Sequence, residues 1–181
     1  MNSKNITKNT FVFGMNVIGK STMLQIIAGL YNNYEGNIAI NNDLVTNLSN
    51  ESIIYLDQFD YLYAGKVIDN FMDANSTFNY NYFYEHKLDE LMNMYKLSLE
   101  SPIINNGSNL SKGQRQIISF LSLLFIERDI YIIDESLSNV EGKLKTMLLK
   151  ILLVEKKNKL IIYCDHDMEN INLFDDVWEI K

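Results

Sequence analysis

The sequence contains little cysteine, proline or tryptophan, with one residue of each among 181. The single cysteine, Cys164, cannot form a disulfide within the chain, and a zinc site built from four cysteines is excluded. Nothing in this pattern requires an oxidising compartment, so we expect an intracellular setting. Long hydrophobic runs are also lacking. The run at residues 117–126 includes two serines and is far shorter than the roughly 20 residues of a membrane-spanning helix.

Positive charge is in deficit. The chain carries 16 Lys and Arg against 23 Asp and Glu, which gives a net charge of −7 and a pI of about 4.8. A protein that binds the phosphate backbone of nucleic acids needs a surplus of cationic groups. We therefore expect no nucleic acid partner.

The sequence does contain a regular alternation of short apolar runs and helix-period segments. Runs rich in β-branched and aromatic residues predict strands at residues 11–13, 37–40, 53–56, 130–133 and 160–163. Apolar residues at helical spacing predict helices between them, one of which presents Met23, Leu24, Ile27 and Leu30 on one face. The alternation predicts an α/β fold with a mainly parallel sheet flanked by helices. We expect a single domain, 1–181, with a core at 1–70 and 129–181 and a helical subdomain at about 71–128.

A glycine-rich loop follows the first predicted strand and fits the pattern G-x-x-x-x-G-K-S/T. It consists of Gly14, Met15, Asn16, Val17, Ile18, Gly19, Lys20, Ser21 and Thr22. Two glycines let the backbone curl so that its N–H groups face phosphate oxygens, while Lys20 reaches the β- and γ-phosphates and the Ser21 hydroxyl binds Mg²⁺. A chance match is the alternative, and the strand before the loop and the helix after it favour the phosphate site.

A second motif is the predicted strand at residues 130–133 followed directly by two acidic residues, Asp134 and Glu135. The carboxyl ends of parallel strands are where ligands of such folds bind. Asp134 is predicted to hold the metal through water, and Glu135 to polarise the attacking water. The alternative is that the acidic residues only mark where the strand reaches solvent. The presence of a phosphate-binding loop in the same chain favours the catalytic interpretation.

A third motif, at residues 109–116, begins a helix. Ser111 and Gln114 have the spacing of a capping box. The segment resembles the LSGGQ signature of ABC-type ATPases, and the resemblance implies that Ser111, Gly113 and Gln114 bind the γ-phosphate held by the opposite subunit of a dimer. It further implies that Gln58 senses metal and attacking water, that residues 138–141 form the D-loop, and that His166 contacts the γ-phosphate.

The resemblance covers about residues 10–181. Residues 58–70, which begin with Gln58, are similar to the pattern that exporters have at this place, including peptide and bacteriocin exporters. The chain departs from the family at Lys112, which replaces a signature glycine, at Glu141, which replaces an aspartate, and at the bulky residues 16–18. The family's N-terminal antiparallel strands, with the aromatic residue that stacks on adenine, are expected to be missing.

This resemblance implies an ATP-hydrolysing subunit or domain of an exporter, with ATP and Mg²⁺ as cofactors. The implied partners are a transmembrane domain and a second nucleotide-binding domain, at the cytoplasmic face of the membrane. The alternative is a degenerate, non-hydrolysing subunit of the same family. An aromatic cluster is interpreted as packing of the helical subdomain, with a docking groove for the membrane domain as its alternative; it contains Phe78, Tyr80, Tyr82, Phe83 and Tyr84.

Overall fold

The computed structural model describes residues 3–15, 19–31, 34–45, 52–58, 61–72 and 77–180. The chain forms two compact units. The core unit comprises Met1–Asp57, Arg128–Glu135 and Thr146–Lys181, and the helical unit comprises Gln58–Glu127 and Ser136–Lys145. Each unit is described here by itself. The assignment of the whole chain to one functional domain stays a prediction.

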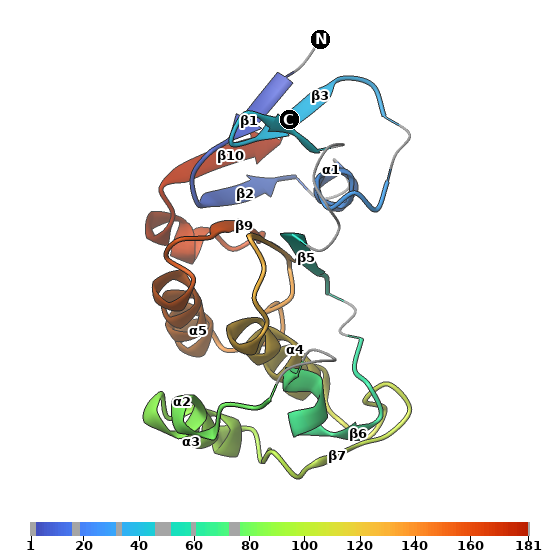
Figure 1. Ribbon diagram of the computed structural model, residues 1–181, viewed down its shortest axis with the longest axis vertical. Helices are drawn as coiled ribbons and strands as arrows, with labels where there is room; N and C mark the ends of the chain where they lie inside the picture. Colours follow the sequence, from blue (N-terminus) through green and yellow to red (C-terminus); the bar gives the residue numbers. More distant parts are fainter. Residues whose placement is uncertain are drawn as a thin grey trace. The chain divides into compact units, whose positions relative to one another are not determined.

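A five-stranded parallel sheet organises the core unit (Figure 1), as the alternating sequence pattern predicted. Its strands stand in the order β10 (Asp176–Ile180), β2 (Thr10–Gly14), β9 (Leu160–Cys164), β8 (Ile130–Asp134) and β5 (Ile53–Leu56). Every residue of β8 and β9 is buried, because these strands are interior and covered on both faces. The parallel register pairs Asp134 with Cys164 and Val12 with Cys164, so the carboxyl ends of β2, β8 and β9 meet at one edge.

A second, small sheet also belongs to the core unit. It contains β1 (Ser3–Ile6), β3 (Asn37–Ile40) and β4 (Asp43–Leu44), with β1 parallel and β4 antiparallel to β3. Asn41 and Asn42 both have positive φ, as a two-residue type I′ hairpin requires. Residues 37–40 therefore form the predicted strand but join a different sheet. The sequence analysis did not predict β1, which lacks an aromatic residue and is not antiparallel to β3.

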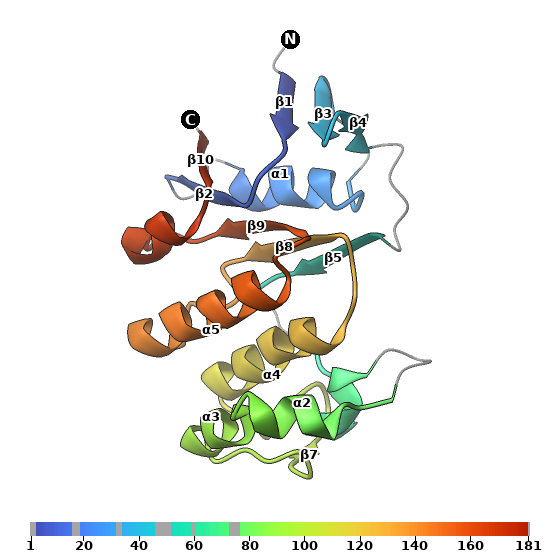
Figure 2. The same ribbon diagram turned by 60° about the vertical axis from the view of Figure 1, so that its left-hand side comes forward.

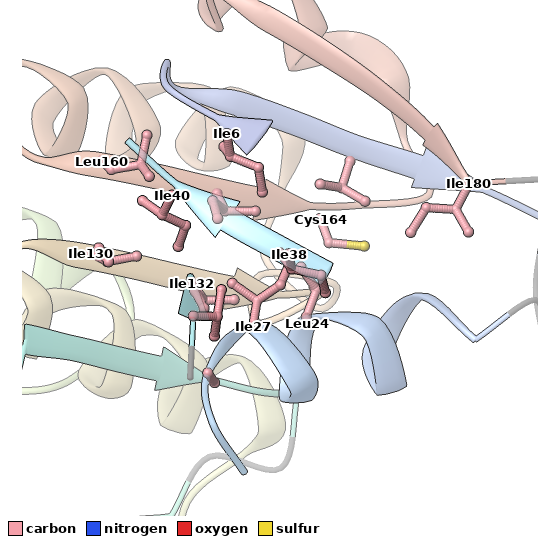
Figure 3. Close-up of a cluster of buried hydrophobic side chains, with 14 residues drawn as sticks. Ile6, Leu24, Ile27, Ile38, Ile40, Ile130, Ile132, Leu160, Cys164 and Ile180 are labelled. Carbon is pink, nitrogen blue, oxygen red and sulfur yellow. The ribbon is translucent and has the colours of Figure 1, made fainter. Parts of the chain in front are cut away.

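Both sheets and α1 (Lys20–Ile27) bury side chains in one hydrophobic cluster. Ile6 of β1 and Ile40 of β3 belong to this cluster, and Figure 3 shows Ile38 of β3 beside Leu24 and Ile27 of α1, with Ile132 of β8 close to Ile27. Burial of one such aliphatic side chain contributes roughly 1.5–3 kcal/mol, so the cluster fixes α1 and the loop before it. The predicted stripe ends early: α1 stops at Ile27, and Leu30 is exposed beyond it.

The helical unit contains η3 (Val67–Phe71), α2 (Tyr80–Glu85), α3 (Leu88–Met94) and α4 (Lys112–Phe125), with a short antiparallel pair of β6 (Gly65–Lys66) and β7 (Pro102–Ile103). Figure 2 shows α2 and α3 as neighbours within it. Phe71, Phe78, Phe83 and Phe125 stack together, which confirms the packing interpretation for Phe78 and Phe83. Tyr80 and Tyr84 instead leave more than half of their surface exposed.

Two more helices lie in the C-terminal part of the chain that the structure describes. The helix α5 (Gly142–Glu155) begins in the helical unit and continues in the core unit, and η4 (Met168–Leu173) precedes β10. Within the residues that the structure describes, none of the helices combines the length and the apolarity needed to cross a bilayer.

Candidate functional site

The loop between β2 and α1 prepares the core unit to hold an anion. Gly19 has φ of +93°, a left-handed conformation that a residue with a side chain adopts only with strain. Gly19, the N-cap residue of α1, has no side chain that could accept the first N–H groups of the helix, and an anion could accept them instead. Ser21 and Thr22 are exposed in this first turn, and Met15 is exposed before it. Asn16, Val17 and Ile18 lie outside the described residues.

Lys20 is the buried cation of this loop. Only 6% of its surface is exposed, and its ammonium donates to the carbonyls of Gly14 at 3.0 Å and Met15 at 3.2 Å. Its Nζ also lies 4.0 Å from Oε1 of Glu135. A buried ammonium is costly without such partners, so the carbonyls and the carboxylate hold it in place. The structure thus brings together Gly14, Lys20 and Glu135, which the sequence analysis assigned to one site.

Glu135 follows β8 in a strained backbone conformation. Its φ is +51°, which is uncommon for a residue with a long side chain. Its N–H donates to the carbonyl of Cys164 at 3.0 Å, and this bond to β9 holds the turn. Strain of this kind costs on the order of 1–3 kcal/mol and is concentrated at functional sites. The turn places the Glu135 carboxylate beside Lys20.

Asp134, the last residue of β8, is 4% exposed, and its two carboxylate oxygens differ. Oδ2 accepts the phenol O–H of Tyr55 at 3.0 Å. Oδ1 is buried and accepts no hydrogen bond from the part of the chain that the structure describes. An orphaned carboxylate oxygen beside a phosphate loop fits a hydrated divalent cation. Across the described ranges no group of three or more His, Cys, Asp or Glu could hold a metal, so a cation here would depend on phosphate and water oxygens, as Mg²⁺ commonly does.

The same environment keeps its neighbouring groups neutral. Burial, followed by the charge of Asp134, raises the pKa of the Tyr55 phenol above its ordinary value. Burial, followed by the charges of Asp134 and Glu135, likewise raises the pKa of the Cys164 thiol. Cys164 is therefore a buried core residue of this site and not a reactive thiolate.

His166 stands just beyond β9, with 57% of its side chain exposed. Its Nδ1 lies 3.3 Å from Oδ1 of the buried Asp165. The Asp165 carboxylate also accepts the O–H of Tyr163 at 2.6 Å and the N–H of Asp167 at 3.1 Å. Asp165 thus anchors the histidine, a role that the sequence analysis missed because no motif specifies the residue before the histidine.

In the helical unit, the start of α4 confirms the predicted capping box. The Gln114 N–H donates to Oγ of Ser111 at 3.2 Å, and the Ser111 N–H donates to Oε1 of Gln114 at 2.8 Å. The Gln114 amide also donates to the carbonyl of Tyr95 at 2.8 Å. Lys112 is exposed, so its side chain leaves this cap intact.

The same helix start is fixed to the segment after Glu135. A Cβ added to Gly113 would lie 3.0 Å from the carbonyl oxygen of Asn139, so this position favours glycine. Gln116 is fully buried; its Oε1 accepts the N–H of Asn139 at 2.8 Å, and its Nε2 donates to Oγ of Ser138 at 3.1 Å. Gln116 was missed from sequence, because its partners are distant in the chain.

Gln58 is half-buried two residues after the end of β5, at the chain position where the helical unit begins. Its role, like those of the other site residues, stays a prediction.

Residues 5–138 match the model of a protein family described as ABC transporter. The chain belongs to the ABC transporter family. Its relatives include the microcin-J25 export ATP-binding/permease protein McjD of Escherichia coli, 34% identical over 90% of this chain and 29% of that protein. Another is the lactococcin-G-processing and transport ATP-binding protein LagD of Lactococcus lactis, 25% identical over 91% of this chain and 24% of that protein. The chain thus spans under a third of the length of these relatives.

Two solved structures support the fold. An ATP-bound bacterial Atm1-family ABC exporter matches with a TM-score of 0.81 and 16% identity, over 96% of this chain and 32% of that chain. A putative ABC transporter ATP-binding protein from Pyrococcus furiosus matches with a TM-score of 0.74 and 21% identity, over 95% of this chain and 84% of that chain. The protein therefore carries the ATP-binding domain fold of exporter-type ABC transporters, as the sequence motifs indicated.

Proposed function

We propose that this chain binds and hydrolyses ATP to drive an exporter. The observation that carries the proposal is the meeting of the buried Lys20, the orphaned Asp134 Oδ1 and the strained Glu135 at the carboxyl ends of β2 and β8. This set offers a cation, a metal-accepting oxygen and a carboxylate base, which are the groups that phosphoryl transfer to water requires.

In this mechanism Lys20 binds the β- and γ-phosphates together with the N–H groups of the loop and α1. Ser21, Gln58 and Asp134 would hold Mg²⁺, which neutralises the charge of the phosphates when bound. Glu135 orients the attacking water and accepts its proton, while the water oxygen bonds to the γ-phosphorus and the bond to the β–γ bridging oxygen breaks. His166, anchored by Asp165, contacts the γ-phosphate.

Two copies, or this chain and a similar one, form the active pair. Ser111, Gly113 and Gln114 at the start of α4 would bind the γ-phosphate on the opposite subunit. A transmembrane domain is the second partner, and the pair works at its cytoplasmic face. The names of McjD and LagD, which refer to export and transport, favour exporter coupling. The alternative of a non-hydrolysing subunit gains no support, since Lys112 leaves the helix cap intact.

Phosphate release by the purified chain with Mg²⁺ and ATP tests this function. Glu135→Gln keeps the shape of the side chain and removes the carboxylate, so turnover should fall by about 10²-fold or more while ATP binding persists. Glu85→Gln, at the end of α2, is the matched control and should keep wild-type turnover. Unchanged turnover in Glu135→Gln would remove this residue from the mechanism.

A further inference from the structure

The phenol of Tyr55 links two strands of the core unit. Tyr55 lies on β5, where the register pairs it with Ile132 of β8. Its O–H donates to Oδ2 of Asp134 at 3.0 Å. A direct hydrogen bond therefore joins the middle of β5 to the carboxylate at the end of β8. None of the sequence motifs assigns a role to Tyr55.

The hydrogen bond from Tyr55 gives the two oxygens of the Asp134 carboxylate different roles. A buried carboxylate without donors is unfavourable and tends to rotate toward a new donor or to take up a proton. Tyr55 satisfies Oδ2, whereas Oδ1 keeps no hydrogen bond from the described residues. The satisfied oxygen sets the orientation of the group, and the orphaned oxygen remains available to a cation.

We propose that Tyr55 is a positioning residue for magnesium, which fixes the Asp134 carboxylate so that Oδ1 receives the cation of the bound Mg-nucleotide. The inference rests on the proposed function. Outer partners of metal-binding carboxylates orient them, and their loss commonly costs about 10–100-fold in metal affinity. Loss of Tyr55 should weaken the binding of the metal and not of the metal-free nucleotide, because Lys20 and the loop hold the phosphates without Tyr55.

Equilibrium binding of a non-hydrolysable ATP analogue, with Mg²⁺ and with EDTA, isolates this effect. The ratio of the two affinities measures how much the metal strengthens binding, independently of turnover. In Tyr55→Phe we expect this ratio to fall by about tenfold, with the EDTA affinity unchanged. Mn²⁺ in place of Mg²⁺ gives a spectroscopic readout, since its electron paramagnetic resonance spectrum should change between wild type and Tyr55→Phe.

Tyr131→Phe is the matched control. Tyr131 lies on the adjacent strand β8, three residues before Asp134, and its phenol oxygen accepts the N–H of Arg128 at 3.1 Å. This variant should keep the wild-type ratio. Tyr55→Leu is a second variant that also lacks the hydroxyl, and it should lower the ratio to a similar extent. Mg²⁺-strengthened binding in wild type together with an unchanged ratio in both Tyr55→Phe and Tyr55→Leu would overturn the inference alone. Failure of wild type to bind the analogue would overturn the proposed function and the inference with it.

Discussion

Replacement of Gln116 tests how the start of α4 is held to the segment after Glu135. Gln116→Leu keeps the volume of this fully buried side chain and removes two hydrogen bonds, to the N–H of Asn139 and to Oγ of Ser138. A net hydrogen bond contributes about 1 kcal/mol, and a buried group left unpaired costs about 1–3 kcal/mol. Asn139 and Ser138 are themselves exposed, so water can replace part of the loss.

The expected loss is therefore about 1–2 kcal/mol, below the full cost of two buried orphans. For a chain of this size it corresponds to a fall in melting temperature of about 2–8 °C. Urea unfolding monitored by circular dichroism would measure the free energy, and thermal scans would check the melting temperature. The ATPase rate should fall as well, since Ser138 and Asn139 belong to the predicted D-loop.

Two further variants show whether the loss in Gln116→Leu comes from these hydrogen bonds. Ser138→Ala removes the acceptor of the Gln116 Nε2 bond and of an exposed bond from Asn139 Nδ2, but it keeps the bond from the Asn139 N–H to Gln116. It should therefore cost less than Gln116→Leu. Ser122→Ala removes a hydroxyl that donates to Ser119 within α4, and it should leave both stability and turnover near wild type. A loss in Gln116→Leu below about 0.5 kcal/mol, or a loss no greater than that of Ser138→Ala, would refute the reasoning.

Three other predictions follow from the same contacts. Glu135→Gly should be about 1 kcal/mol more stable toward urea than Glu135→Ala, because φ of +51° suits glycine; the reverse order would contradict strain at this residue. Gly113→Ala should lower the stability in urea unfolding by up to about 2 kcal/mol, because the cost of pressing a Cβ on the Asn139 carbonyl, about 1–3 kcal/mol, exceeds the gain of about 1 kcal/mol from alanine in a helix; a raised midpoint would count against that contact. Burial, then Asp165, raises the pKa of Tyr163, so stability is fully present below pH about 10 and falls toward higher pH as the unfolded state alone loses the proton. Tyr163→Phe should flatten this alkaline decline in urea midpoints, and an equally steep decline would contradict it.

The parts of the fold that sequence predicted are those specified by local pattern. Residues 130–133 and 160–163 are apolar at every position, which is how interior parallel strands read, and both became central strands. Ser111 and Gln114 are three residues apart, and the spacing of a capping box is enough to place a helix start. By contrast, residues 37–40 carried the same strand signal but joined the small sheet, because partner choice depends on the Asn41–Asn42 turn and on β1.

The contacts that sequence missed share a physical reason. Gln116 bonds to residues 22 and 23 positions away, and Tyr55 bonds to Asp134, 79 positions away. Glutamine and tyrosine are ordinary residues of helices and strands, so neither signals a partner until the chain has folded. Motifs mark groups that touch phosphate, because the chemistry of phosphate restricts residue type and spacing. A residue that positions one of those groups needs only to supply a hydrogen bond at the right place in the fold. Several types of side chain can do this, so the residue type alone does not reveal the role. The supporting contacts of this site therefore had to come from structure, and the Tyr55 and Gln116 variants test whether such contacts influence metal binding and turnover.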